Sequence, residues 1–196
     1  MISTQHIAKA LSYSAFNQLN EQLIKEGKTT GTNQSAEFVE YGRVNYQRMS
    51  RVYKTTVLSQ ELLLALDALK KNYTFLVITE GWCGDSAQIV PVFERMCEHS
   101  NKLDLKFLLR DENSELMDAY LTNGARSIPK LICIDRDTLE EKFVWGPRPA
   151  ALQAEVTRLL AAHVSKEEKG LFVQKWYNEN KTAAIQQEMA KLLQGL

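Results

Sequence analysis

The chain has 196 residues, of which 44% are hydrophobic and 24% are charged, a composition typical of one folded domain with additions. Its 24 lysine and arginine residues balance 24 aspartate and glutamate residues, so nothing indicates a nucleic acid or an acidic membrane surface as a partner. No apolar run approaches the roughly 18 residues of a membrane helix, and the N-terminus lacks the regions of a secretory signal. With three cysteines and no export signal, we expect the protein to work in a reducing cytoplasm.

The first fifty residues are predicted to form a helical arm. Residues 1–27 have apolar side chains at helical spacing, and Gly27 is expected to end this helix. The polar residues 28–36 are expected to form a loop, and 37–53 again have helical spacing. Two interpretations of the arm stay open: a packing extension, or a lid or partner-binding arm near the functional site.

The middle of the chain alternates helices and strands. Ser59 is expected to cap a helix that runs to about Asn72. Further elements are then expected as a strand at 75–79, a helix after residue 83, a strand at 103–109, a short helix at 111–122, strands at 131–134 and 142–145, and a helix at 150–163. This order indicates a mixed sheet with helices on both faces.

The C-terminal residues 166–196 are predicted to add a further helix. The polar residues 178–181 are candidates for a break in it. Trp176 and Tyr177 are interpreted as core residues that pack against the domain rather than as a site for a partner.

The main functional signal lies at residues 82–86, Trp-Cys-Gly-Asp-Ser, where a buried strand turns into a helix. This position places the Cys83 sulfur at the first helical turn, where unpaired N–H groups and the helix macrodipole favour an anion. We therefore predict an exposed thiol with a lowered pKa. The alternative is a buried cysteine that serves only as a small apolar side chain. The Ser86 hydroxyl either donates to the thiolate or caps the helix, and capping is the simpler interpretation.

Three motifs, in this order, resemble those of the thioredoxin superfamily. They are the Trp-Cys-Gly turn with a proline eight positions after the cysteine (Pro91), the Ser-Ile-Pro segment at 127–129 before a strand, and Trp145-Gly146 before the closing helix. The resemblance covers roughly residues 52–164. It implies an α/β, thioredoxin-like domain at 52–164, with a mixed central sheet, and helical extensions at 1–51 and 165–196.

The resemblance also implies the residues of the site. Cys83 and Ser86 occupy the catalytic positions, and the residues expected to contact the substrate are Trp82, Gly84, Asp85, Ile128 and Pro129. Pro129 is expected to be the cis-proline that faces the cysteine. Ile128 is expected to pair its backbone with an extended substrate. Trp82 is expected to form an apolar rim, with Trp145 nearby.

The chain departs from the family's dithiol pattern because Ser86 replaces the second cysteine. Cys97 lies about 21 Å further along the same helix, outside the roughly 7 Å Cα separation of a disulfide. Cys133 lies within a strand and is expected to be packed core. A lone thiolate can still form a mixed disulfide that an outside thiol releases.

The acidic residues near the cysteine are a second difference from the pattern of the thioredoxin superfamily. Asp85 opposes the thiolate, so the expected decrease of the Cys83 pKa is modest. Val77 stands six positions before the cysteine, where many relatives carry a buried acid. Glu80 is the nearest replacement for that acid, or else a solvated strand-end residue.

The first functional hypothesis is a monothiol thioredoxin-like protein that exchanges disulfides with protein or low-molecular-weight partners through Cys83. The rival is a non-catalytic binding module for an extended peptide, in which Cys83 is incidental. A peroxide-reactive cysteine is a weaker third option, which the Asp85 charge opposes. No cofactor and no metal is expected, because the cysteines and histidines lack ligand spacing. The sequence does not indicate an oligomeric state.

Overall fold

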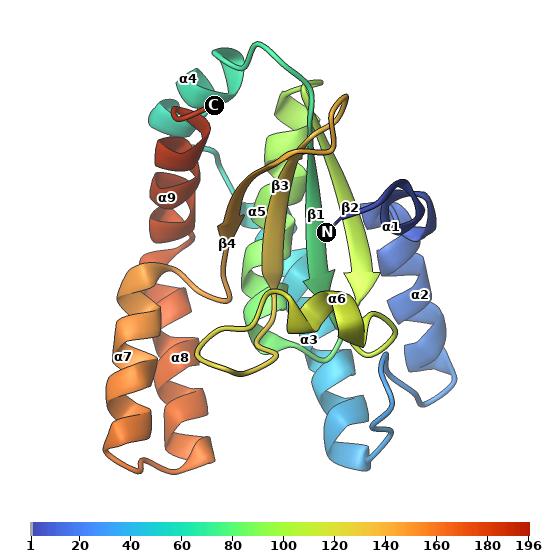
Figure 1. The fold of residues 1–196 in the computed structure, drawn as a ribbon. Helices are drawn as coiled ribbons and strands as arrows, with labels where there is room; N and C mark the ends of the chain where they lie inside the picture. The colour runs from blue at the N-terminus through green and yellow to red at the C-terminus, as the bar shows by residue number, and fades with distance from the viewer. Residues whose placement is uncertain (1) are drawn as a thin grey trace.

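The computed structural model describes residues 2–196 and arranges them as a four-stranded sheet with helices around it (Figure 1). The strands are β1 (Tyr73–Thr79), β2 (Leu103–Leu109), β3 (Lys130–Asp135) and β4 (Glu141–Trp145). The helices are α1 (Thr4–Lys9), α2 (Tyr13–Lys25), α3 (Ala36–Thr55), α4 (Gln60–Asp67), α5 (Gly84–His99), α6 (Ser114–Asp118), α7 (Ala150–Ala161), α8 (Lys166–Asn180) and α9 (Ala183–Leu193). Met1, which the expected first helix included, lies outside the described residues.

The sheet has the strand order β2-β1-β3-β4. β1 pairs in parallel with β2 and antiparallel with β3, and β3 pairs antiparallel with β4. The mixed α/β sheet expected from the sequence is therefore confirmed. All seven residues of β1 are buried, because neighbouring strands flank it and helices cover both of its faces. The chain leaves β1 through α5 and returns as β2, which is the usual crossover for a parallel pair.

The two faces of the sheet carry cores of different size. Phe75 and Val77 point into the larger core, to which α2–α5 and α7–α9 contribute. Leu76 and Ile78 point into a smaller core beneath α1 and α6. Figure 1 shows α5 behind the sheet and α6 in front of it, near the end of the sheet where β1 and β2 terminate. The loop after β1 (residues 80–83) and the loop before β3 (residues 127–129) lie at this end.

The N-terminal arm begins with two helices rather than with the single helix expected for 1–27. The reason is Leu11, which pairs with Phe107 at the outer edge of β2 through backbone hydrogen bonds of 2.9 and 2.8 Å. Extended backbone at this point ends α1, and the Ser12 side chain then caps α2 by accepting from the Ala15 N–H. The bridge thus fixes the arm to the sheet.

The same arm contributes to the main core. Phe16 is fully buried and stacks on Phe107, with the ring centroids 4.9 Å apart. α3 packs along α5 and runs without interruption through residues 51 and 52, where the sequence suggested a domain boundary. The division at 1–51, 52–164 and 165–196 stays a prediction.

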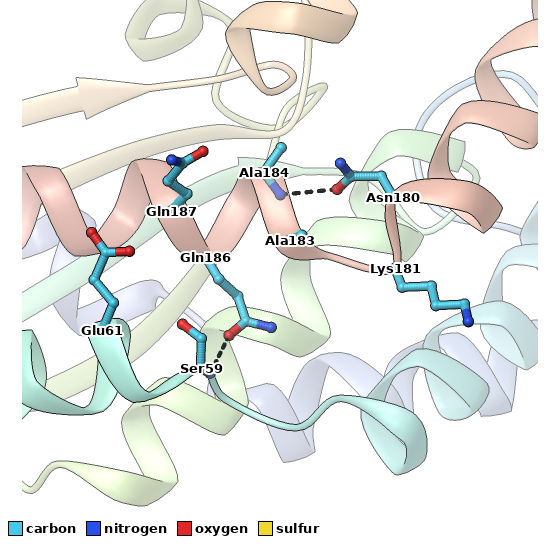
Figure 2. Close-up of a pocket in the computed structure, with 8 residues that line it drawn as sticks. All are labelled: Ser59, Glu61, Asn180, Lys181, Ala183, Ala184, Gln186 and Gln187. Atoms are coloured by element: carbon cyan, nitrogen blue, oxygen red, sulfur yellow. Dashed lines mark hydrogen bonds between the residues drawn. The ribbon is translucent and has the colours of Figure 1, made fainter.

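The C-terminal segment forms two helices, with the break close to the polar residues singled out in the sequence. Lys181 and Thr182 have positive φ values of 47° and 70°, which end α8 and redirect the chain into α9. The side chain of Gln186 then ties α9 to the start of α4 (Figure 2). Its carbonyl accepts from the Ser59 N–H at 2.7 Å, and its amide donates to Val57 O at 3.1 Å.

Several predicted boundaries shift by a few residues. The helix capped by Ser59 ends at Asp67 rather than near Asn72, and α6 is shorter than the expected 111–122. β3 and β4 each begin one residue earlier than expected. Within residues 2–196, no helix is both long and apolar enough to cross a membrane.

The packing of Phe16 yields a first prediction. Phe16→Ala removes a fully buried ring from the contact with β2, so it should lower the free energy of unfolding by about 3–5 kcal/mol. Val57→Ala is the control, because Val57 is 82% exposed and its truncation should change stability by less than about 0.5 kcal/mol. Chemical denaturation of both variants checks this. Equal stability of the two variants would show that the arm is not part of the core.

Candidate functional site

Residues of the N-terminal arm hydrogen-bond to the cysteine loop (residues 80–83) and hold it in place. The Gly81 N–H donates to the Thr30 hydroxyl at 2.7 Å, and the Asn45 amide on α3 donates to Trp82 O at 2.7 Å. A side chain at Gly81 would overlap the side-chain oxygen of Asn20, so the close approach of Asn20 favours glycine at this position. The loop that ends in Cys83 is thereby fixed by residues 20–45, far away in sequence.

Cys83 caps α5, and its sulfur is enclosed by two loops. The Ser86 N–H donates to Sγ at 3.5 Å, and the thiol donates to the Ile128 carbonyl at 3.3 Å. The residue is only 6% exposed. The predicted position at the start of the helix is therefore correct, whereas the predicted exposure of the sulfur is wrong, because the loop at 127–129 covers it.

The predicted decrease of the Cys83 pKa is also wrong. Burial, followed by the negative charge of Asp85, raises the pKa of the Cys83 thiol to about 11, although hydrogen bonds from Ser86 and the Asp85 backbone favour the thiolate. Burial withdraws the sulfur from water, and this disfavours the charged form more than the helix N-terminus favours it. The thiol is therefore protonated at neutral pH.

Ser86 has a role that the sequence did not indicate. The cap of α5 is Cys83, so the interpretation of Ser86 as the cap is wrong. Its side chain is buried, and the Thr79 hydroxyl at the end of β1 donates to Ser86 Oγ at 2.6 Å. Ser86 therefore joins the first turn of α5 to β1 beside the cysteine.

Asp85 is held in a buried network rather than presented to solvent. Arg148 donates to both carboxylate oxygens, at 3.0 Å from Nε and 2.6 Å from a terminal nitrogen, and the Tyr177 hydroxyl donates at 2.9 Å. We call these three residues the Asp85 network. Burial raises the pKa of Asp85, and Arg148 and Tyr177 oppose that increase. Asp85 was expected to contact substrate; instead its carboxylate is occupied by these two side chains.

The partners of Asp85 could not be found from the sequence. Arg148 and Tyr177 are 63 and 92 residues away along the chain, so no local spacing links them to Asp85. Arg148 lies between Pro147 and Pro149, just before α7, in a segment with no functional motif. Tyr177 is buried, as its interpretation as a core residue required, but its hydroxyl also has a specific partner.

Trp82 and Gly84 flank the cysteine on the side of α3. Trp82 is half-buried, with the Phe38 ring edge-on at 5.1 Å and the Arg110 guanidinium over its face at 4.8 Å. Gly84 is exposed, and the Arg48 guanidinium is 3.7 Å from the place where a Cβ would stand. The Trp82 ring therefore has neighbours in the chain, whereas Gly84 is exposed and lies against the Arg48 and Asn45 side chains.

The proline loop (residues 127–129) meets the cysteine loop through Ile128. The Ile128–Pro129 peptide bond is cis, and both residues are buried. Gly146, at the end of β4, has a φ of +110°, and a side chain there would overlap Pro129 O. The expected glycine after the last strand therefore lies directly against the proline loop. Trp145, expected near the cysteine, instead packs on Phe93 and donates to Glu188.

Glu80 is buried rather than solvated. It is 1% exposed, and one carboxylate oxygen accepts from the Asp111 N–H at 2.9 Å. Burial raises the pKa of Glu80. This hydrogen bond joins the residue after β1 to the turn after β2, so the Glu80 carboxylate helps to hold the start of the cysteine loop in place.

The other two cysteines lie as the sequence suggested. Cys97 is near the far end of α5, and Cys133 is fully buried in β3. All three cysteines are free. Burial raises the pKa of Cys133 to about 12 and that of Cys97 well above its usual value. Residues 2–196 contain no group of three histidine, cysteine or acidic side chains that could hold a metal ion.

Two cavities lie away from the cysteine. One, of about 400 Å³, lies between the start of α4 and the turn between α8 and α9 (Figure 2). Among the residues that line it, Gln186 accepts from the Ser59 N–H, and the Asn180 side chain accepts from the Ala184 N–H at 2.9 Å. The second, of about 230 Å³, lies between the end of α1 and the end of β2. Neither cavity is lined by Cys83 or Ile128.

The sheet order, the cysteine at the start of α5 and the proline loop opposite define an α/β protein of the thioredoxin-like class. A family model described as Thioredoxin matches residues 31–164, and the chain belongs to this family.

Two solved structures share the fold. A protein of unknown function from Pseudomonas aeruginosa aligns with a TM-score of 0.66 and 15% identity, covering 100% of this chain and 99% of that chain. An HIV epitope-scaffold aligns with a TM-score of 0.58 and 16% identity, covering 95% of this chain and 99% of the other. A search of the curated proteins finds no match. At these identities the likeness concerns the fold alone, and it includes the helices at both ends.

The raised thiol pKa yields a prediction for alkylation. Only the thiolate reacts, and with a pKa of about 11 its fraction should rise about tenfold for each pH unit between pH 7 and pH 10. Iodoacetamide labelling of the folded protein, followed by peptide mass spectrometry, should give a Cys83 rate that increases throughout this range. Cys97 and Cys133 should react more slowly still. A plateau of the Cys83 rate near pH 8.5 would contradict the buried, protonated thiol.

The Asp85 network yields a prediction for stability. Arg148→Met leaves a buried carboxylate without its cation and should cost about 3–5 kcal/mol at neutral pH. Arg148 opposes the increase of the Asp85 pKa that burial causes, so in the variant the folded-state pKa of Asp85 should rise further above its unfolded value. Stability is lost as pH rises through a raised folded-state pKa, and the variant should lose more of it than the wild type, so the deficit should be smaller at pH 5 than at pH 8.

Denaturation of wild type and variant at both pH values measures this difference. Arg158→Met is the control, because it removes an exposed ion pair with Glu155 and should change stability by less than about 1 kcal/mol. A deficit that is equal at pH 5 and pH 8 would show that Arg148 stabilises the fold through packing rather than through the Asp85 charge.

Proposed function

We propose that the chain forms mixed disulfides through a single nucleophile, Cys83. The observation that carries this proposal is the position of the sulfur, which accepts from the Ser86 N–H at the start of α5 and lies 3.3 Å from Ile128 O in the proline loop. A sulfur at this junction becomes accessible to a partner if the proline loop moves by a small distance. The family to which the chain belongs supports the same position as the reactive one.

The proposed exchange is a displacement at sulfur. The Cys83 thiol loses its proton to solvent, and the thiolate attacks one sulfur of the partner's disulfide. A new bond joins Cys83 Sγ to that sulfur, the partner's own S–S bond breaks, and the electron pair leaves with the second sulfur as a thiolate. An outside thiol reverses the step and restores the Cys83 thiol.

The raised pKa determines the rates of this cycle. A thiol that is protonated at neutral pH attacks slowly, and a thiolate of high basicity is also a poor leaving group. Within residues 2–196, no second cysteine is placed to displace the partner, because Ser86 has no sulfur, Cys97 lies far along α5 and Cys133 is fully buried in β3. The chain would therefore hold a partner in a long-lived mixed disulfide rather than reduce many partners in succession.

The proposed partners are protein or low-molecular-weight thiols and disulfides. The zero net charge gives no attraction to nucleic acid or to an acidic membrane surface. A reducing cytoplasm is the proposed setting, since it supplies the outside thiol that releases the partner and the three cysteines are unpaired.

A binding module without thiol chemistry is the second candidate, and the burial of Cys83 favours it. A cysteine that is 6% exposed and donates to Ile128 O could serve only to hold the proline loop in place. In that case an extended partner segment would pair with the backbone of the proline loop, and the sulfur would never be attacked.

Trapping experiments separate the two candidates. After incubation with a disulfide-containing peptide at pH 9, the wild-type chain should accumulate a dithiothreitol-sensitive adduct on Cys83, and Cys83→Ser should abolish it. The control variant Cys97→Ser keeps the proposed nucleophile and should keep the adduct. No adduct on Cys83, together with peptide binding that survives Cys83→Ser, would leave only the binding module.

A further inference from the structure

Arg48 lies next to Gly84, the residue that follows Cys83. It lies on α3, is half-buried, and places a guanidinium nitrogen 3.7 Å from the position that a Gly84 Cβ would occupy. The Arg48 guanidinium donates to the side-chain oxygen of Asn45, and the side-chain amide nitrogen of Asn45 donates to Trp82 O at 2.7 Å. The guanidinium is therefore held in place through the same residue that fixes the cysteine loop.

The charges around this position do not balance. Asp85 is the acidic group that interacts with Arg48, but Arg148 and the Tyr177 hydroxyl already occupy its oxygens. Within residues 2–196, Arg48 has no carboxylate within ion-pair distance. Two guanidinium groups thus share one carboxylate, and burial lowers the pKa of Arg48, which shows that its charge is partly withdrawn from water.

A half-buried cation that has no carboxylate in direct contact and lies beside exposed Gly84 is suited to a negative charge on an incoming molecule. Arginine is well matched to a carboxylate, because its planar fork can donate two parallel hydrogen bonds. Gly84 directly follows Cys83 and is exposed, so an incoming group at this residue would meet the Arg48 guanidinium. The neighbouring Arg51 lies one turn further on the same helix and is exposed.

We propose that Arg48 selects partners whose disulfide carries a carboxylate close to the reacting sulfur. This inference rests on the proposed mixed-disulfide function and adds the chemical class of the partner. The carboxylate binds the Arg48 guanidinium beside Gly84, and the adjacent disulfide sulfur is thereby placed near Cys83 Sγ. The bond changes are those of the exchange above: one S–S bond breaks, one forms with Cys83, and the leaving sulfur carries away the electron pair.

The test uses two small disulfides of similar size and opposite charge. Dithiodipropionate carries two carboxylates, and cystamine carries two ammonium groups. Rates of adduct formation on Cys83 are measured for the full chain at pH 9 and low salt by mass spectrometry, and each is divided by the rate of the urea-unfolded chain with the same disulfide. This division removes the intrinsic reactivity of each probe.

The wild-type chain should favour dithiodipropionate over cystamine, and Arg48→Gln should reduce this preference by about threefold to fivefold, as expected for one partly exposed charge pair. Arg51→Gln removes the same unit of charge from the same helix and should leave the preference unchanged. Arg48→Lys keeps the charge and should keep most of the preference, which separates loss of charge from loss of structure. Raising the salt concentration should weaken the preference in wild type.

The outcomes separate this proposal from the one on which it rests. Adducts on Cys83 with no charge preference, or an equal loss of preference in Arg48→Gln and Arg51→Gln, would contradict the selection by Arg48 and leave the exchange function standing. The absence of any adduct on Cys83 with either disulfide would contradict both proposals.

Discussion

The buried ion pair between Asp85 and Arg148 is the interaction on which the arrangement of the site depends. It joins the first turn of α5 to the segment between β4 and α7, and Tyr177 extends it to α8. A buried carboxylate is stable only when cations and donors satisfy it, so these three elements must meet at one place. That place is two residues after Cys83. The C-terminal helices therefore belong to the environment of the thiol and are not remote additions.

Two opposing effects decide the state of Cys83, and their magnitudes show which prevails. The start of a helix stabilises an anion by about 0.3–1 kcal/mol, or up to about 2 kcal/mol in buried geometries. A thiol pKa of about 11, against about 8.5 for an unperturbed cysteine, corresponds to about 3 kcal/mol in favour of the protonated form, at 1.36 kcal/mol for each pKa unit. Burial under Ile128 and the charge of Asp85 therefore outweigh the helix, and the protonated thiol can donate to the Ile128 carbonyl.

Much of the fold was predictable because the strands, turns and helix caps concerned depend on residues that are close together in the sequence. The β-branched run of β1, the turn at Cys83 and the Ser59 cap each depend on neighbouring residues, and each was placed correctly. The break in the N-terminal arm was not predictable, because the periodicity of Leu11 is helical and its partner is Phe107, in β2. Contacts across such distances leave no spacing signal in a single sequence.

The chemistry of the site was harder to predict than its location. The position of Cys83 at the start of a helix follows from neighbouring residues, and it suggested a reactive thiolate. Burial of the sulfur depends instead on residue 128, and the contacts of the Asp85 carboxylate depend on Arg148 and Tyr177, all of which are distant in the sequence. The sequence therefore placed Cys83 correctly at the start of α5 but assigned its thiol the wrong protonation state. The same reasoning applies to Glu80, whose burial depends on the Asp111 backbone beyond β2.

The most direct test of this account is the protonation state of Cys83 itself. The ¹³Cβ chemical shift of Cys83, followed by NMR in the folded chain from pH 6 to pH 11, reports the thiol and the thiolate without any reagent. A buried thiol that donates to Ile128 should keep the shift of a protonated cysteine until the pH approaches about 11. A titration midpoint below the value of about 8.5 for an unperturbed cysteine would mean that the helix N-terminus outweighs burial, and the account of the site would be wrong.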